Sequence, residues 1–332
     1  MYWGRVYMKI KVGIIGYGNI ARGVEKEIKK HKDMELVAIF TRRNVSEVIS
    51  ENKVYNINQI QKFIGKIDVM ILCLGSFSDL PKYAHVVAKN FNTIDSYDTH
   101  AKIHEYHKHI NKINKKSNTV SLVSIGWDPG IFSFVRLMFE SVLPTSNTYT
   151  FWGNGVSQGH SEAIKRIQGV KTAVQYTHPK EDAINKVREG IIQRFKTRDK
   201  HTRECFVVLE EDNAENRRNI EKKIKTMPNY FSDYDTTVNY ITEEEFESNH
   251  TKMPHGGFAI CSGTTGDGNK QIAELSLKLD SNPEFTASVL LAYTRATYKL
   301  SNEKKYGAYT IYDVPLSYIS DKSATDLIKR LL

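Results

Sequence analysis

Apolar segments alternate with amphipathic segments through the first third of the chain. The apolar segments occupy positions 10–16, 35–40, 68–75, 92–97 and 119–126. Between the first two, Ile20, Val24 and Ile28 recur every fourth residue while lysines occupy the opposite face, which is typical of an amphipathic helix. Continuous apolar strands separated by helices predict a parallel sheet covered on both faces. We therefore expect an α/β domain with a doubly wound, Rossmann-type parallel sheet.

The pattern changes after about residue 127, where long helical segments lie between strands of alternating polarity. In the segment 272–280, Leu275, Leu277 and Leu279 share one face, which predicts an antiparallel sheet with one buried side. No repeat or low-complexity linker separates the two halves, so the boundary depends on this change of pattern alone. The expected division is a first domain over 1–127, a second α+β domain with a mostly antiparallel sheet over 128–282, and a helical segment 283–332 that returns to the first domain.

Composition places the chain among ordinary globular proteins. It has 332 residues, of which 40% are hydrophobic and 26% charged, enough for two domains. The longest apolar runs are far shorter than the roughly 20 residues of a membrane span, and the first ten residues lack the apolar core of an export signal. Three cysteines stand far apart, which argues against disulfides and favours a cytoplasmic location.

Charge and histidine spacing raise two possibilities that the local sequence does not favour. The net charge is +9, but the lysines are interspersed with acids and form no basic stripe, so we do not expect a nucleic-acid partner. His100, His104 and His107 fall near helical spacing, yet lysines surround them and no acid or cysteine completes a ligand set. We therefore expect no metal.

A glycine-rich turn follows the first predicted strand and opens the first predicted helix. Its sequence, GYGNIA, comprises Gly16, Tyr17, Gly18, Asn19, Ile20 and Ala21. In this context the first glycine makes the tight turn, the second admits a pyrophosphate, and the small third residue lets the helix pack on the strand. The amino end of the helix then offers N–H groups to the phosphates. The turn predicts a dinucleotide site.

The end of the second predicted strand indicates which dinucleotide. An acid at this position would accept the ribose hydroxyl of NAD, whereas this chain has Thr41, Arg42 and Arg43. Guanidinium groups suit a 2′-phosphate, so NADP(H) is the expected cofactor, although two solvated arginines would give the same pattern. At the next strand end, Cys73, Gly75 and Ser76 either line the same crevice or form a plain turn.

Acidic residues follow two further predicted strands. Asp95 and Asp98 lie in the sequence DSYDTH, and Asp128 lies in GWDPG. Carboxylates beside a nicotinamide could bind an ammonium group and accept its proton, but Asp98 could equally cap a helix and Asp128 could start a turn. His255 lies in the sequence MPHGG, predicted to be a loop in which the backbone approaches a ligand, and a structural role remains open.

Ten ordered motifs resemble the meso-diaminopimelate dehydrogenase family, with similarity from about Lys9 into the C-terminal helix. They are GYGNIARGVEK, FTRR, DSYDTH, GWDPGIFS, FWGNGVSQGHS, VQYTHP, HTRECFVV, TMPNYF, HTKMPHGG and LDSNPEFTAS. The resemblance implies NADP-dependent oxidative deamination of the D-centre of meso-2,6-diaminopimelate, which yields L-2-amino-6-oxopimelate, ammonia and NADPH. The reverse reaction would serve lysine and cell-wall precursor biosynthesis.

The resemblance also implies roles for individual residues. Asp98 and Asp128 would face the reacting amine, and Trp127 and Trp152 would shape the pocket. The distal L-amino-acid end would be bound by Thr177, Arg203, His255 and Asn282. A homodimer formed through the second domain is a further implication. The residues do not decide which aspartate is the base.

Two other functions remain as alternatives. A sugar or inositol dehydrogenase of similar two-domain plan would carry a Glu-Lys-Pro motif, and EKP does not occur in this chain. A non-catalytic NADP sensor would bind the cofactor without turnover, and it would not need Asp98, Asp128, Arg203 and His255.

Overall fold

The computed structural model describes residues 9–332, which form two compact units. One unit contains the described part of Met1–Phe134 together with Pro283–Leu332, and the other is Val135–Asn282. The division lies within helix α4 (Ile131–Val142), a few residues beyond the boundary expected at 127. The prediction that the chain has no export signal was based on its first ten residues, and most of these lie outside the described part of the chain. Among residues 9–332, no helix is long and apolar enough to span a membrane.

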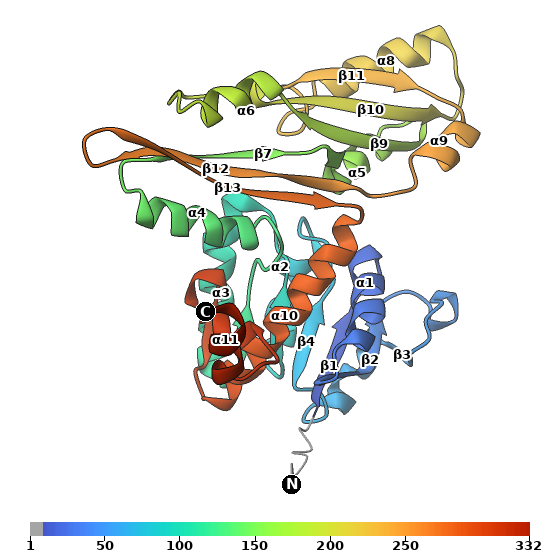
Figure 1. Ribbon diagram of the computed structural model, residues 1–332. Coiled ribbons are helices and arrows are strands. Elements are labelled where there is room, and N and C mark those ends of the chain that lie inside the picture. Colours follow the sequence, from blue (N-terminus) through green and yellow to red (C-terminus); the bar gives the residue numbers. More distant parts are fainter. Residues whose placement is uncertain (1–8) are drawn as a thin grey trace. The chain divides into compact units, whose positions relative to one another are not determined.

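The first unit is built on a seven-stranded parallel sheet (Figure 1). Its strand order is β14-β6-β5-β4-β1-β2-β3. The bounds are β1 (Ile10–Ile15), β2 (Met34–Thr41), β3 (Val54–Asn56), β4 (Val69–Leu72), β5 (Asn92–Asp95), β6 (Val120–Leu122) and β14 (Gly307–Tyr309). All five predicted strands are confirmed, while β3 and β14 had no prediction. Four of the predicted strands extend past the observed carboxyl ends, by one to four residues, and the structure has loops at those positions.

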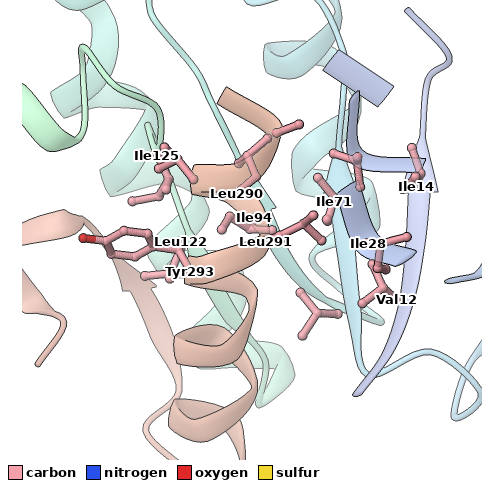
Figure 2. Packing of buried hydrophobic residues seen from close by; sticks show 14 of the residues in the cluster. Val12, Ile14, Ile28, Ile71, Ile94, Leu122, Ile125, Leu290, Leu291 and Tyr293 are labelled. Carbon is pink, nitrogen blue, oxygen red and sulfur yellow. The ribbon is translucent and has the colours of Figure 1, made fainter. Parts of the chain in front are cut away.

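Apolar side chains cover both faces of this sheet, as the continuous apolar runs predicted. Along β1, Ile14 belongs to one buried cluster and Ile15 to the other. Figure 2 shows the first cluster, where Leu290 and Leu291 lie near Ile71 and Ile94 of the sheet. The helices of this unit are α1 (Asn19–Glu27), α2 (Asp79–Val87), α3 (Ile103–Ser117), the start of α4, α10 (Asn282–Asn302) and α11 (Ala324–Leu331).

Helix α10 packs closely on α1, which explains a glycine in α1. A Cβ atom at Gly23 would lie 3.0 Å from the Cβ of Ala287 and 3.1 Å from the carbonyl oxygen of Pro283. Leu290 and Leu291 are fully buried in the same cluster as Val24 and Ile28. The C-terminal segment is therefore part of the core of this unit.

The second unit contains two small sheets rather than the one that the sequence suggested. One has the order β11-β10-β9-β8 and the other β13-β12-β7. Their strands are β7 (Asn147–Trp152), β8 (Gly155–Val156), β9 (Val170–Pro179), β10 (His201–Leu209), β11 (Asp235–Tyr240), β12 (His255–Thr265) and β13 (Asn269–Leu279). Strands β10 and β11 pair in parallel, and the other pairs are antiparallel.

The predicted alternation in this unit is confirmed, but the prediction of long helices is wrong. Along β13, Leu275 and Leu277 are half-buried and Leu279 is buried, while the residues between them are exposed. The helices are α5 (Gln158–Lys165), α6 (Glu181–Arg188), α7 (Thr197–Lys200), α8 (Ala214–Lys225) and α9 (Glu243–Asn249), together with the end of α4. Four of these helices, α5, α6, α7 and α9, have eight residues or fewer.

Candidate functional site

The glycine-rich turn has the geometry that its sequence predicts. Gly16 has a φ of +89°, and a Cβ atom there would lie 2.4 Å from the carbonyl oxygen of Cys73, so only glycine fits. Gly18 caps α1, and a Cβ atom there would meet nothing within 4 Å. That open space lies at the amino end of α1, where Asn19 and Ile20 begin the helix. A phosphate could occupy it and accept hydrogen bonds from the helix N–H groups.

The arginines after β2 extend the site toward its anionic ligand. Thr41 is buried, and its hydroxyl oxygen accepts a hydrogen bond from the N–H of Arg43 at 3.1 Å. The Arg43 guanidinium donates to the carbonyl oxygen of Tyr17 at 2.5 Å, which ties this strand end to the glycine-rich turn. Arg42 pairs with Asp79 at 2.5 Å and lies over the Tyr83 ring, 4.9 Å from its centroid. Two guanidinium groups are thus held beside the turn.

The loop after β4 supplies space rather than charge. Burial raises the pKa of Cys73 to about 12, so its side chain is a neutral thiol. A Cβ atom at Gly75 would meet nothing within 4 Å, and the Gly75 carbonyl accepts the N–H groups of Asp79 and Leu80 at the start of α2. The Ser76 hydroxyl accepts the N–H of Asp98 at 3.2 Å and so links this loop to the one after β5.

The three acids at and beyond the carboxyl ends of β5 and β6 have different environments. Asp98 is exposed and Asp128 is half-buried, as expected of groups that meet a ligand, and both follow neighbouring parallel strands. Trp127 is buried and packs edge-on against Phe132 at 5.4 Å. Asp95 is 1% exposed and already accepts three hydrogen bonds, so it is not available to a substrate amine. Burial raises the pKa of Asp95 to about 6, although each of the three donors lowers it.

In the second unit, Thr177 and Arg203 lie directly opposite each other. Thr177 is on β9 and Arg203 on β10, in register in an antiparallel pair. Both are buried, and the Arg203 guanidinium donates to the Thr177 hydroxyl oxygen. The side-chain amide of Gln175 donates to the same oxygen at 3.3 Å. With two donors on its oxygen, the Thr177 hydroxyl has its own proton left to donate to a ligand.

Arg203 is a buried cation without a carboxylate partner among the residues that the structure describes. The side chain is 6% exposed, and its Nε atom has no hydrogen-bond acceptor. Its guanidinium stacks on the Tyr234 ring, 3.9 Å from the centroid. Burial lowers the pKa of Arg203, and burial together with this guanidinium lowers the pKa of His160 to about 3. Buried charges are normally paired, so this group calls for an anionic ligand.

His255 reaches the same region by a route that differs from the prediction. It was expected in a loop, but it is the first residue of β12, because β12 pairs with β13 along its whole length. Its backbone lies against β8: a Cβ atom at Gly155 would be 2.4 Å from the Cα of His255. Gly155 on β8 in turn pairs with Thr177 on β9, and Thr177 pairs with Arg203 on β10. His255 on β12 therefore lies against the strand next to that of Thr177.

Trp152 and Asn282 lie at the ends of elements in this unit. Trp152 ends β7, and its N–H donates to Nε2 of His201 at 2.8 Å. Burial lowers the pKa of His201 to about 3, so the ring is neutral and can accept this bond. The indole stacks on the same ring at 5.4 Å. Asn282 begins α10, and its N–H donates to the carbonyl oxygen of Met253, two residues before His255.

Each unit therefore gathers its own group of predicted residues. In the first, the turn, the arginines and the loops after β4, β5 and β6 share the carboxyl edge of the sheet. In the second, strands β7 to β10 and β12 bring the aromatic, hydroxyl, guanidinium and imidazole groups together. The prediction missed Gln175, Tyr234, His201 and Gly155. The two-residue spacing of His201 and Arg203 would have placed them on one face, but their partners depend on strand register.

Comparison with protein-family models finds the diaminopimelic acid dehydrogenase C-terminal domain over residues 126–281. A relative from Ureibacillus thermosphaericus, meso-diaminopimelate D-dehydrogenase, is 55% identical over 98% of this chain and 99% of its own length. The enzyme of the same name from Corynebacterium glutamicum is 44% identical over 97% of this chain and 98% of its own length.

Three solved structures have the same fold. C. glutamicum diaminopimelate (DAP) dehydrogenase in complex with DAP is 42% identical with a TM-score of 0.93. A variant of the Clostridium tetani E88 enzyme with six substitutions, solved with DAP, is 51% identical with a TM-score of 0.92. An engineered D-amino acid dehydrogenase bound to NADP+ is 41% identical with a TM-score of 0.89. Each match covers 98% of this chain and 100% of the other. The chain belongs to the meso-diaminopimelate D-dehydrogenase family.

Proposed function

We propose that this protein catalyses the reversible, NADP-dependent oxidative deamination of the D-centre of meso-2,6-diaminopimelate. The products are L-2-amino-6-oxopimelate, ammonia and NADPH. Full-length relatives with this activity in their names support the proposal, and so does a solved relative in complex with DAP. In the cell, the reaction would supply or consume a precursor of lysine and of the cell wall.

The observation that carries the proposal is the buried guanidinium of Arg203, which has no carboxylate partner among the described residues. An enzyme that acts on one head of a substrate with two amino-acid heads must bind the other. Arg203 can form a bidentate pair with the distal carboxylate, and the Thr177 hydroxyl can donate to the same group. Binding the distal head also orients the reacting C–H bond, which converts binding energy into rate.

Substitutions in the C. tetani variant support the same residues. That variant replaces one Gln, Thr, Arg, Pro, His and Asn, in this order along its chain. In this chain, the same types occur in the same order as Gln158, Thr177, Arg203, Pro254, His255 and Asn282. The separations from Gln to Thr to Arg, and from Pro through His to Asn, are also the same. We therefore add Gln158 and Pro254 to the proposed substrate residues, with Trp152 beside them.

The residues of the first unit fit NADP(H). The open space at Gly18 accommodates a pyrophosphate, and Arg42 and Arg43 with Thr41 offer donors to a 2′-phosphate. The remaining proposed contacts come from Gly16, Tyr17, Asn19, Ile20, Ala21, Cys73, Gly75 and Ser76. A relative of the same fold is bound to NADP+. When bound, the cofactor accepts the hydride from the substrate carbon.

In this proposal, Asp98 and Asp128 carry out the proton transfer. A carboxylate beside the substrate ammonium accepts one of its protons, so that the hydride leaves from a neutral amine. Water then adds to the resulting imine carbon, and ammonia departs. Trp127, buried next to Asp128, would exclude bulk water from this end of the substrate.

Assembly and location are also proposals. The family resemblance favours a homodimer formed through residues 128–282, which light scattering of the purified protein would test. A cytoplasmic location follows from the biosynthetic role and the widely spaced cysteines.

The test of the proposed function is a turnover assay with purified protein. We would offer meso-, LL- and DD-diaminopimelate in turn with NADP and then NAD, and follow cofactor reduction by near-ultraviolet absorbance. Turnover confined to the meso isomer and strongest with NADP is the expected result. Tight NADPH binding without turnover of any isomer would contradict the proposal and favour the NADP sensor.

A further inference from the structure

One buried carboxylate contacts both loops that carry the proposed proton-transfer residues. Asp95 is the last residue of β5 and is 1% exposed. Its Oδ1 atom accepts the N–H of Tyr97 at 3.0 Å and the N–H of Ser124 at 3.1 Å. Its Oδ2 atom accepts the hydroxyl of Tyr106 at 2.7 Å.

The two backbone donors stand at the start of the two loops. Tyr97 directly precedes Asp98, and Ser124 begins the segment that leads to Asp128. Ser124 has a φ of +60°, a conformation that costs free energy for a residue with a side chain. The hydrogen bond from its N–H to Asp95 helps to hold that conformation, and the N–H of Ile125 donates to the Asp95 carbonyl at 2.8 Å.

Neighbouring groups hold the Asp95 carboxylate in one orientation. Tyr106 lies on α3, and its ring stacks on that of Tyr97 with centroids 4.2 Å apart. The hydroxyl that meets Oδ2 is therefore fixed by packing from a third element. Because both backbone donors meet the same oxygen, an amide oxygen at this position would satisfy them equally well.

We propose that Asp95 is a positioning residue for the proton-transfer step, one that fixes the loop of Asp98 and the loop of Asp128 relative to each other. It does so through hydrogen bonds and does not touch the substrate. This inference rests on the proposed function, since it takes Asp98 and Asp128 to act on the substrate amine.

The test compares two substitutions at one position. Asp95→Ala removes the acceptor, so kcat with meso-diaminopimelate should fall roughly 100-fold, the scale expected when catalytic groups shift by about 1 Å. The KM for NADP should change less than about 3-fold, because Asp95 is not among the proposed cofactor contacts and distant sites act nearly independently. Asp95→Asn keeps an oxygen for both N–H groups, and Tyr106 can then accept from the new amide. The kcat of Asp95→Asn should therefore lie within about 3-fold of the wild-type value.

A matched control separates positioning from loss of stability. Thr93 lies two residues earlier on β5, is buried, and its hydroxyl bonds that of Ser121 on β6 at 2.7 Å. Thr93→Val removes this buried bond between the same two strands without touching the loops, so it should lower the melting temperature and leave kcat unchanged.

Three outcomes would overturn the inference. They are a wild-type kcat in Asp95→Ala, a defect in Asp95→Asn as large as in Asp95→Ala, and a comparable loss of kcat in Thr93→Val. If Asp95→Ala does not fold, two other variants decide: Asp95→Asn should keep kcat within about 3-fold of wild type, and Tyr106→Phe, which removes only the bond to Oδ2, within about 10-fold. A larger loss in either variant would overturn the inference. Absence of turnover by the wild-type protein would instead refute the proposed function.

Discussion

Replacing Arg203 by methionine should damage catalysis without damaging the fold. The side chain is 6% exposed and has no carboxylate partner among the described residues, so the free enzyme holds an uncompensated buried cation. In the enzyme–substrate complex, the proposed pair with the distal carboxylate compensates it. Methionine has a similar length and no charge, so it removes the pair and also removes the cost of burying the cation.

The two effects have opposite signs and can be estimated separately. Truncating one partner of a buried charge pair costs about 3 kcal/mol, which lowers kcat/KM roughly 150-fold. For the fold, relief of desolvation stabilises by about 1–4 kcal/mol. Loss of the stacking on Tyr234 and of the bond to Thr177 costs about 2 and about 1 kcal/mol. These contributions largely cancel, so the free energy of unfolding should change by between about −2 and about +1 kcal/mol.

Initial rates and thermal melts of the purified variant test this reasoning. With meso-diaminopimelate and saturating NADP, kcat/KM should fall roughly 150-fold, while the melting temperature stays within about 6 °C of the wild-type value. Arg203→Lys keeps the positive charge but loses the two parallel N–H donors of the guanidinium, so its loss of kcat/KM should be smaller than that of Arg203→Met. With a D-amino acid that has no distal carboxylate, the kcat/KM of Arg203→Met should stay close to the wild-type value. The assigned role would be refuted if Arg203→Met retained most of its kcat/KM with meso-diaminopimelate, or if its kcat/KM fell equally with both substrates.

Four further variants should have separable effects. Arg42→Ser with Arg43→Ser should lower kcat/KM with NADP by roughly 100-fold and with NAD by less than about 3-fold; equal losses would contradict the 2′-phosphate contacts. Gly18→Ala should weaken NADPH binding in a fluorescence titration at an unchanged melting temperature, whereas Gly16→Ala should lower the melting temperature, because its Cβ would clash with a backbone oxygen. His201 is neutral in the fold down to about pH 3 but protonates near 6.5 when unfolded, so stability should fall by up to about 1.4 kcal/mol per pH unit below 6.5. His201→Gln should reduce that slope in chemical denaturation; an unchanged slope would count against the neutral ring.

Local chemistry explains which parts of the fold the sequence predicted. Strands such as 10–15 are continuous apolar runs, and Gly16 is dictated by a turn that no other residue can make, so both are visible in the residues themselves. Strand β14 has three residues and exists only because it pairs with β6, far away in the chain. No local pattern could reveal it.

The candidate site likewise contains residues that the local sequence reveals and residues that depend on distant contacts. Arg42, Arg43 and Asp128 were predicted because each follows a strand, and strand ends meet at one edge of a parallel sheet. The contact between Arg203 and Thr177 depends on the register of β9 and β10, and that register is set by packing across the whole unit. The burial of Asp95 likewise depends on Tyr106, on a helix that had been considered only for its histidines.

The return of α10 to the first unit has a consequence for synthesis on the ribosome. Leu290 and Leu291 belong to the same buried cluster as Val12 and Ile14, yet the whole second unit is translated between them. A nascent chain therefore exposes the apolar face of its first sheet until nearly all of the protein has been made. That delay favours early folding of the inserted unit and makes the emerging parallel sheet a natural client for chaperones.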